Sequence, residues 1–312
     1  MKAIVIGKGS IGKRHEKILN LICNDVISLS SKKFLKKKTN LKKLILQPNR
    51  TIVFICSATK FHMDVLKKFT FQNLNVFIEK PVIHQKKEII FFNNFVKKYN
   101  LNIFNGYMLR NDPRIILLKK KLIKKINEVK YAKFNLQTNM PTWHLNEDFR
   151  KGYANNKKLG GGVLLTCGHE IDLSIMLFGP PKKVFCIKNK SKLRNDVENS
   201  VILIIYHSNN IKSEITIDFE NDYTKKRNFE IYLKNSLLRW DFYKDFFTEE
   251  KNYNLKKIYP KKSSTIDNIY IYQIKNLLKL INKKHTIKEK LYAEKVIFAA
   301  KKSIVSEKVE KV

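Results

Sequence analysis

The stretch AIVIGKGSIGKRH near the N-terminus most constrains the fold, because an apolar run leads directly into three glycines and a basic, amphipathic stretch. The glycines Gly7, Gly9 and Gly12 have the spacing G-x-G-x-x-G. Between a strand and a helix, such glycines allow a tight turn, close approach of a pyrophosphate and close packing of helix on strand. Backbone N–H groups at the helix N-terminus, around Ser10 and Ile11, would then favour a bound phosphate. The stretch predicts a dinucleotide-binding turn, with an ordinary strand–helix turn as the alternative.

Apolar runs and helical patterns alternate along the first third of the chain. Apolar runs lie at residues 3–6, 26–29, 51–58, 75–82 and 101–109, with amphipathic or polar segments between them. Strands that alternate with helices and are apolar on both faces are typical of a doubly wound parallel sheet. We therefore predict an α/β, Rossmann-type domain over residues 1–118.

The pattern changes after about residue 118, where longer runs alternate apolar and polar residues. These runs are KYAKFNLQT, KVFCIK, NSVILIIYH, KSEITIDFE, RNFEIYLK and SLLRWDF. A period of two predicts strands with one packed and one wet face, and hence a large antiparallel sheet. Helices are expected near residues 160–178, 267–283 and 288–305. Residues 119–312 are thus predicted to form a second, α+β domain.

The excess of positive charge is large but dispersed. The chain has 63 Lys and Arg against 27 Asp and Glu, which gives a formal net charge of +36. Nearly all the basic residues are lysines spread over the whole length beside abundant Asn and Ile, a bias typical of AT-rich coding. A nucleic-acid reader would more often concentrate arginines and exposed aromatics on one element. We expect anionic small molecules as partners and no specific nucleic acid; steeply salt-dependent affinity for DNA would favour the other interpretation.

Other features of composition bear on the compartment. No apolar run approaches the roughly 18–20 residues of a membrane span, so no membrane partner is expected. The start of the chain leads straight into a strand-like run, unlike a signal peptide. The cysteines, Cys23, Cys56, Cys167 and Cys186, form no C-x-x-C pair, so we expect neither a metal site nor a disulfide framework. A reducing cytoplasm fits these features best.

The end of the second apolar run bears on the choice of cofactor. NAD-binding folds usually carry Asp or Glu there to bind the ribose, whereas this chain has SLSSKK, with Ser30, Ser31 and Lys32 and no acid. Hydroxyls followed by cations suit a ribose 2′-phosphate, so NADP is favoured over NAD. Because lysines occur throughout the chain, NAD stays the alternative.

Two later stretches carry residues suited to proton transfer. Lys80 in EKP follows a predicted strand, and ligands of open α/β sheets bind beyond strand carboxyl ends. Its ammonium could hydrogen-bond a substrate hydroxyl or assist proton transfer, with a solvated lysine as the alternative. His169 and Asp172 in LGGGVLLTCGHEIDLSIMLFG lie three residues apart, on one helical face. A carboxylate beside an imidazole suits a general base; the alternative is a structural histidine.

Together these stretches resemble the Gfo/Idh/MocA family, the group of glucose–fructose oxidoreductase and inositol dehydrogenase. GKGSIGKRH resembles its cofactor turn, CSATKFH its third-strand segment, IEKPV its EKP signature, NGYMLRNDP the end of its nucleotide domain and GGGVLLTCGHEIDL its substrate-site helix. The matches lie in the family's order. Many members carry D-x-G-x-H where this chain has the shorter TCGH, with Thr166 in place of the Asp. The short form and NEDFRKGYANNKKLGGG (residues 146–162) are similar to a branch associated with surface-polysaccharide and nonulosonic-acid sugars.

The resemblance implies an NAD(P)-dependent oxidoreductase acting on a sugar, sugar acid or nucleotide sugar, with a C-terminal domain that binds substrate and pairs subunits into a homo-oligomer. It implies that Lys80 polarises the substrate oxygen, that His169 removes the hydroxyl proton and that Asp172 orients His169. The cofactor residues implied further along the chain are Ser57, Thr59, His62, Glu79 and Lys80. The substrate residues implied are Tyr107, Arg110, Thr166 and His169. Since Thr166 replaces an acid, a non-catalytic sensor that binds the cofactor is the alternative function.

Overall fold

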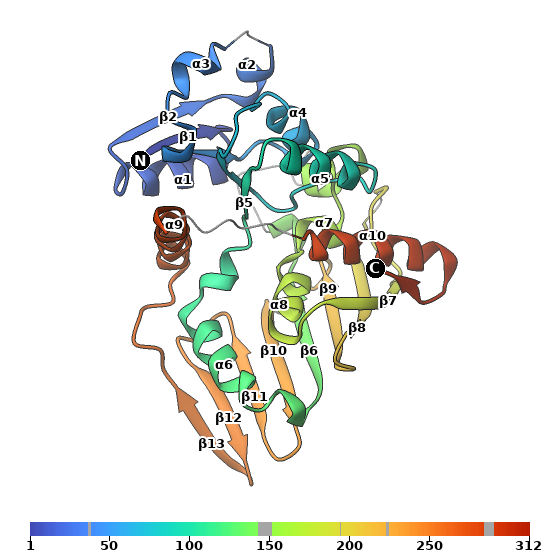
Figure 1. Cartoon of the computed structure of the whole chain (residues 1–312). Helices are drawn as coiled ribbons and strands as arrows, with labels where there is room; N and C mark the ends of the chain where they lie inside the picture. The colour runs from blue at the N-terminus through green and yellow to red at the C-terminus, as the bar shows by residue number, and fades with distance from the viewer. Residues whose placement is uncertain (37–38, 143–151, 194, 223–224, 284–289) are drawn as a thin grey trace. The chain divides into compact units, whose positions relative to one another are not determined.

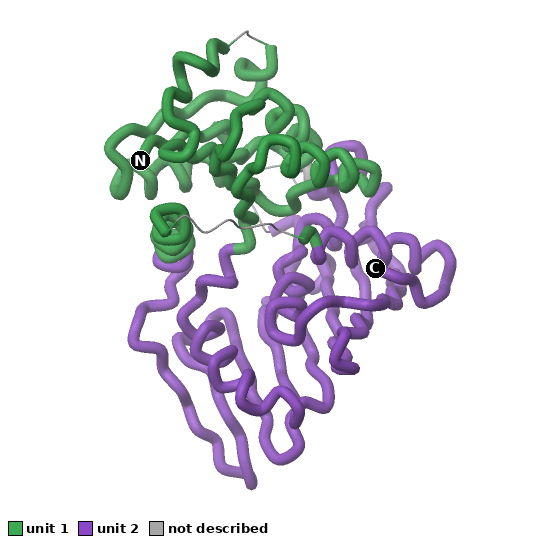
Figure 2. The backbone as a smooth tube through the Cα atoms, viewed as in Figure 1, with its two compact units in different colours: residues 1–107, 270–291 green, residues 108–269, 292–312 purple. Residues whose placement is uncertain are grey.

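The computed structural model describes residues 1–36, 39–142, 152–193, 195–222, 225–283 and 290–312. The chain forms two compact units (Figure 2). Unit 1 is Met1–Tyr107 with Tyr270–Leu291, and unit 2 is Met108–Ile269 with Tyr292–Val312. The division thus follows Tyr107 and not the predicted residue 118, and a late segment of the chain returns to unit 1. Part of the predicted helix at 288–305 lies outside the described residues.

Unit 1 contains a parallel sheet of five strands in the order β2-β1-β3-β4-β5 (Figure 1). The strands are β1 (Lys2–Ile6), β2 (Asp25–Leu29), β3 (Thr51–Ile55), β4 (Asn75–Ile78) and β5 (Asn102–Asn105). The helices are α1 (Ser10–Asn20), α2 (Ser31–Lys36), α3 (Leu41–Leu44), α4 (His62–Leu66), α5 (Glu88–Lys98) and, from Tyr270 on, α9 (Ile266–Asn282). Because β3 and β4 are buried along their whole length, their sequences are continuous apolar runs after the first residue of each strand. The predicted Rossmann-type sheet is confirmed.

The helix α9 joins unit 1 through apolar packing. Its residues Ile274, Leu277 and Ile281 belong to one buried cluster with Ile18 and Leu19 of α1. Alternate residues of β1 and β3 complete this cluster, so α1 and α9 cover the same face of the sheet. This packing explains why a segment near the C-terminus belongs to the N-terminal unit.

Unit 2 contains a sheet of nine strands in the order β13-β12-β11-β10-β6-β9-β8-β7-β14. The strands are β6 (Val129–Gln137), β7 (Pro181–Lys188), β8 (Ser200–His207), β9 (Lys212–Asp218), β10 (Lys226–Leu233), β11 (Leu237–Asp241), β12 (Phe247–Lys251), β13 (Asn254–Ile258) and β14 (Glu310–Lys311). The helices are α6 (Pro113–Ile123), α7 (Val163–Thr166), α8 (His169–Phe178) and α10 (Tyr292–Ser306). Burial alternates along β8, β9 and β10, as the period of two predicts.

Two features of this sheet differ from the prediction. Strands β6 and β9 pair in parallel, while the other neighbours that pair are antiparallel, so the sheet is mixed. Strands β12 and β13, with the sequences FTEEK and NLKKI, were missed because they carry no apolar alternation. They lie at one edge of the sheet, where β13 is largely exposed and needs no apolar face.

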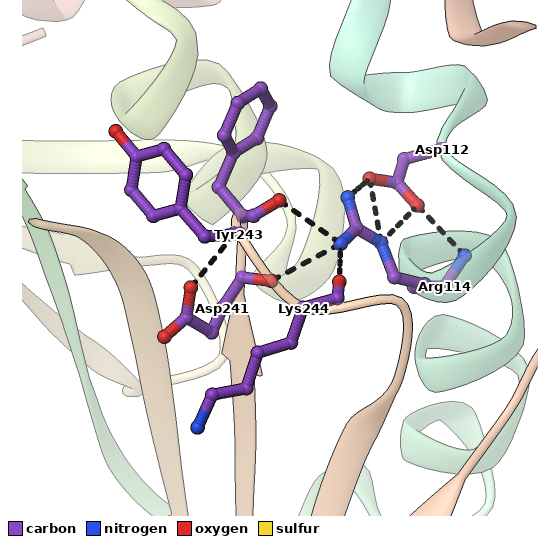
Figure 3. A network of polar contacts seen from close by, with 6 residues as sticks. Asp112, Arg114, Asp241, Tyr243 and Lys244 are labelled. Atoms are coloured by element: carbon purple, nitrogen blue, oxygen red, sulfur yellow. Dashed lines mark hydrogen bonds and ion pairs between the residues drawn. The ribbon is translucent and has the colours of Figure 1, made fainter. Parts of the chain in front are cut away.

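Arg114 fastens α6 to the turn after β11 (Figure 3). The side chain of Asp112 caps the helix by accepting the Arg114 N–H at 2.8 Å, with Pro113 at the first helical position. The same carboxylate accepts from the Arg114 guanidinium, with Nη2 2.6 Å from Oδ2. The guanidinium also donates to the carbonyls of Asp241, Phe242 and Lys244. Sequence patterns missed α6, although the Asp-Pro pair is a helix-start signal.

Candidate functional site

The three glycines after β1 differ in their surroundings. Gly7 has φ +133°, and a Cβ there would lie 2.3 Å from the Cys56 carbonyl oxygen. A Cβ on Gly12 would lie 2.0 Å from the carbonyl oxygen of Gly7. A Cβ on Gly9, in contrast, would meet no atom within 4 Å. Gly7 and Gly12 are therefore required by packing, whereas Gly9 leaves open space above the turn.

The helix α1 begins directly beside this open space. Gly9 precedes its first residue, no side chain caps it, and its first turn contains no acid. The first backbone N–H groups and the positive end of the helix dipole are thus available to an anion. Strand order also reverses here, because β2 and β3 lie on opposite sides of β1, and such switch points are where open α/β sheets bind ligands. The residues present fit the pyrophosphate of a dinucleotide; Ser10 is exposed, while Ile11 packs against the core.

A cavity of about 300 Å³ lies at the end of β2. Its lining residues are Lys8, Ser28, Leu29, Ser30, Lys33, Phe34 and Thr39. The Gly7 N–H donates to the Leu29 carbonyl at 2.8 Å, so the cavity and the glycine turn are joined through the backbone. Of the predicted residues only Ser30 lines it; Ser31 and the exposed Lys32 do not appear in its described lining. Sequence reasoning missed Lys8 and Lys33, although Lys33 belongs to the same SLSSKK stretch.

The carboxylate of Glu79 faces the interior of unit 1. It follows β4 and is 6% exposed. Its Oε1 lies 2.7 Å from Nε2 of His15, and its Oε2 accepts the backbone N–H of Lys80 at 3.1 Å. Lys80 itself is half-buried, and its peptide bond to Pro81 is cis. The implied cofactor role of Glu79 stays a prediction; the contacts described here are with its own unit.

His62 ties together the segments that follow β3 and β4. The ring is 1% exposed, with Nε2 2.9 Å from the Ser57 carbonyl and Nδ1 3.1 Å from that of Pro81. Burial lowers the pKa of His62, an effect opposed by these carbonyl contacts and by the charge of Glu79. Thr59 is also buried, and the Ser57 hydroxyl has no hydrogen-bond partner among the described residues. These contacts give His62 a structural role, and its contact with a cofactor stays a prediction.

In unit 2, Gly162 directly before α7 accommodates Glu198. Gly162 has φ +97°, and a Cβ there would lie 2.4 Å from Oε1 of Glu198. The Glu198 carboxylate pairs with Lys301 at 3.2 Å, and its backbone carbonyl accepts the Val163 N–H. This contact fixes the start of α7, which precedes α8 and its first residue, His169.

Two arginines bind the two acids of α8. Arg110 donates to both oxygens of Asp172, with Nε 2.9 Å from Oδ2 and Nη2 2.6 Å from Oδ1. Arg227 of β10 donates from Nε to Oε1 of Glu170 at 2.8 Å. Both carboxylates are almost fully buried. The predicted substrate residue Arg110 is thus engaged with Asp172. The expected pairing of Asp172 with His169 stays a prediction.

Sequence reasoning missed Glu170 and Arg227. A usable signal was the rarity of arginine, because only eight of the 63 basic residues are arginines. Those of unit 2 that bind carboxylates are Arg110, Arg114, Arg227 and Arg239. In a chain biased to lysine, arginine marks positions that need a planar, multidentate donor.

The remaining predicted substrate residues are buried. His169 is 7% exposed at the start of α8, and Thr166, the last residue of α7, is also buried. Tyr107, which ends the first segment of unit 1, is 1% exposed. Lys80 and Tyr107 belong to unit 1, whereas Arg110, Thr166 and His169 belong to unit 2, so their common site stays a prediction.

Replacing Arg110 with Met should lower the free energy of unfolding by roughly 3 kcal/mol at neutral pH, because the buried Asp172 carboxylate loses its partner. Burial raises the pKa of Asp172, and Arg110 opposes this. Without Arg110, the pKa of Asp172 in the folded state rises further above its value in the unfolded state. As pH falls, Asp172 becomes protonated, and the variant no longer loses stability from an unpaired buried charge. The loss should therefore shrink in urea unfolding near pH 4.5, toward the unfolded pKa of about 3.9.

Arg239→Met is the matched control, because its partners Glu230 and Glu250 are partly exposed and the expected loss is about 0–1 kcal/mol. An Arg110→Met loss that is equal at both pH values would contradict the assigned pairing.

Among the described residues, no single helix combines the length and apolar character needed to cross a membrane; the bent pair Lys157–Thr166 and His169–Phe178 meets that test by length and composition only.

Two family models match the chain. Residues 1–107 match the oxidoreductase family, NAD-binding Rossmann fold, and residues 120–239 match the GFO/IDH/MocA C-terminal domain. No curated protein matches the chain in sequence.

Several solved structures share the fold. Levoglucosan dehydrogenase in complex with NADH and L-sorbose matches with a TM-score of 0.81 and 15% identity, over 100% of this chain and 98% of that chain. GenD2 from gentamicin A biosynthesis, in complex with NAD, has a TM-score of 0.77 and 14% identity over 100% and 96%. UDP-N-acetylglucosamine 3-dehydrogenase GnnA from Acidithiobacillus ferrooxidans has a TM-score of 0.75 and 16% identity over 98% and 97%. At these identities the likeness concerns the fold.

Proposed function

The chain belongs to the Gfo/Idh/MocA family of NAD-binding oxidoreductases, and we propose that it transfers hydride between a nicotinamide cofactor and a ring hydroxyl or ketone of a sugar, sugar acid or nucleotide sugar. The observation that carries the proposal is the open space above Gly9 beside the uncapped start of α1. Gly9 is exposed, so a pyrophosphate could reach the backbone N–H groups at the start of this helix. The names of the similar dehydrogenases, which include a levoglucosan and a UDP-N-acetylglucosamine enzyme, support a sugar as the substrate class.

The proposed chemistry divides between two side chains. Bound nicotinamide supplies the hydride acceptor or donor. Lys80 donates a hydrogen bond to the reacting oxygen of the sugar, and His169 takes the hydroxyl proton during oxidation or returns it during reduction. Asp172, with Arg110, and Glu170, with Arg227, hold α8 and so position His169 at its first residue. In this proposal Asp172 orients His169 from the same helix while its carboxylate binds Arg110.

The finer sequence predictions are part of the proposal. They are a substrate among surface-polysaccharide sugars, a homo-oligomer and a cytoplasmic location. The branch resemblance that supports the first rests partly on residues 146–151, which lie outside the described residues. Substrate contacts by Tyr107 and Thr166 belong to the same proposal.

The cavity at the end of β2 supports NADP as the preferred cofactor. It brings Lys8 and Lys33 beside the Ser30 segment, with the Ser28 hydroxyl buried and without a hydrogen-bond partner among the described residues. Its described lining contains no Asp or Glu to repel a 2′-phosphate or to bind a 2′-hydroxyl. Two ammonium groups and a hydroxyl are the donors that a phosphate monoester requires.

Lys33→Ala should weaken NADPH binding about tenfold and leave NADH binding unchanged, since it removes a charged donor to the 2′-phosphate alone. Fluorescence titration of both cofactors measures this. Lys32→Ala is the matched control, because Lys32 is adjacent, exposed and outside the described lining, and it should change neither affinity. Equal affinity of the native protein for NADPH and NADH would remove the argument for NADP.

The function itself is tested by binding both cofactors to the purified protein and then adding a panel of free sugars, sugar acids and nucleotide sugars. We expect tight binding and a change in nicotinamide absorbance with at least one sugar. Tight binding without turnover of any sugar would favour the sensor, the alternative that Thr166 keeps open. Absence of cofactor binding would contradict both functions.

A further inference from the structure

His15 is a polar side chain placed in an apolar environment. It lies on α1, three residues after Gly12, and is fully buried. Its ring centroid is 5.3 Å from that of Phe54, 5.1 Å from that of Phe77 and 5.7 Å from that of Tyr270. Its Nδ1 has no hydrogen-bond partner among the described residues, so Nε2 is the ring atom through which it acts. An aromatic hydrocarbon ring would fill this position without the cost of burying two nitrogens.

The partner of Nε2 is Glu79, which in turn holds the backbone of Lys80. One Glu79 oxygen lies 2.7 Å from Nε2 of His15 and the other accepts the Lys80 N–H at 3.1 Å. The backbone N–H of Glu79 donates to the Ile55 carbonyl at 3.0 Å, so the residue is anchored in the sheet. Its charge also contributes, after burial, to raising the pKa of the Cys56 thiol. The glycine turn itself packs on Cys56, through Gly7 and Gly12.

Gly106 supplies the room for this arrangement. A Cβ on Gly106 would lie 2.7 Å from Oε2 of Glu79 and 2.9 Å from its Cα. Any larger residue would therefore push Glu79 away from the Lys80 N–H. Glu79 thus contacts His15 and packs closely on Gly106, although the three residues are far apart in sequence.

Stability alone does not account for the pair. Apolar residues of similar volume usually replace a buried ionic or charge-assisted pair without loss, whereas the loss of one partner is costly. What the pair adds is a fixed connection between α1, whose N-terminus we assign to the pyrophosphate, and the residue that carries the Lys80 ammonium.

We propose that His15 and Glu79 form a buried positioning relay, His15 Nε2–H to Glu79 to Lys80 N–H, that couples cofactor seating on α1 to the placement of Lys80. The inference rests on the proposed function, because it concerns the lysine that acts there. His15 and Glu79 are positioning residues and touch neither substrate nor cofactor in this role. A cofactor whose pyrophosphate binds the N-terminus of α1 orders the Lys80 segment through the relay.

The test uses His15→Phe, which keeps the ring volume and removes the donor, and His15→Gln, whose amide donates in place of Nε2. Hydrogen exchange of the Lys80 amide, resolved by NMR, should be at least about tenfold faster in His15→Phe and close to native in His15→Gln. NADH should slow this exchange in the native protein and in His15→Gln, but not in His15→Phe. With a turned-over sugar, kcat should fall about 10–100-fold in His15→Phe with little change in KM.

His207→Phe is the matched control, because this buried histidine of unit 2 contacts the Gly179 carbonyl and the Ser213 hydroxyl. It should lower Tm without changing Lys80 exchange or kcat. If His15→Phe does not fold, Gly106→Ala tests the same link by displacing Glu79 and should also speed Lys80 exchange.

Unchanged Lys80 exchange, with and without NADH, in a folded His15→Phe protein would overturn the relay. The outcomes for the two proposals are distinguishable. If the native protein turns over no sugar, the proposed function fails, while the exchange measurement still decides whether the relay exists.

Discussion

Replacing His169 with Ala is expected to reduce turnover about 10²–10⁴-fold, the range that a positioned acid–base group contributes, and to leave NADH and NADPH affinity unchanged. His169 begins α8 in unit 2, whereas the glycine turn and the β2 cavity that fit the cofactor lie in unit 1. The removal of a proton acceptor should therefore act on kcat and not on cofactor binding. Steady-state kinetics with the best sugar and fluorescence titration of both cofactors measure the two quantities.

The control for this prediction is His207→Ala, a second buried histidine of unit 2. Its loss of stability should resemble or exceed that of His169→Ala, while its turnover stays near the native value. Loss of cofactor binding in a folded His169→Ala protein would show that the histidine supports the cofactor site, and the proton-transfer role would be wrong.

Gly9→Ala is expected to lose cofactor affinity but keep its stability, whereas Gly12→Ala is expected to lose stability. Gly9 has φ −75° and ψ −178°, which alanine adopts freely, and its new Cβ meets no atom within 4 Å. The protein should fold with native Tm, yet bind NADH and NADPH on the order of 100-fold more weakly, because the methyl group occupies the space of the pyrophosphate. At Gly12 the Cβ would lie 2.0 Å from the Gly7 carbonyl oxygen, so the free energy of unfolding should fall by about 1–3 kcal/mol or more.

Urea unfolding and cofactor titration of the two variants separate these effects. Native cofactor affinity in Gly9→Ala would mean that no ligand approaches the turn, and the dinucleotide site would be an ordinary strand–helix turn after all. Native stability in Gly12→Ala would instead mean that α1 can shift away from β1.

The pattern of apolar and polar residues predicted those strands whose burial is reflected in their own sequence. Continuous apolar runs predicted β3 and β4, because a strand covered on both faces needs apolar residues throughout. Alternation of apolar and polar residues predicted β8, β9 and β10, because a strand that is covered on one face needs apolar residues only on that face. The charged strands β12 and β13 were not predicted, because this edge hairpin forms through backbone pairing of the two strands, and β13 is largely exposed.

The candidate site was predicted less completely, because its decisive contacts join residues about sixty positions apart. Asp172 lies three residues from His169, and that spacing suggested their pairing, but it gave no sign that the same carboxylate binds Arg110 through both oxygens. The sequence likewise gave no sign that the Glu79 carboxylate contacts His15, 64 residues earlier in the chain.

By itself, the sequence determined the two sheets, the glycine turn between β1 and α1 and the order of the chemically active stretches. These depend on hydrophobic period and on backbone freedom, which neighbouring residues set locally. Only the tertiary structure decided which acid meets which base, why α9 belongs to unit 1 and why β6 and β9 run in parallel. Such choices follow from which buried charges and apolar faces come together in space, and no local period carries that information.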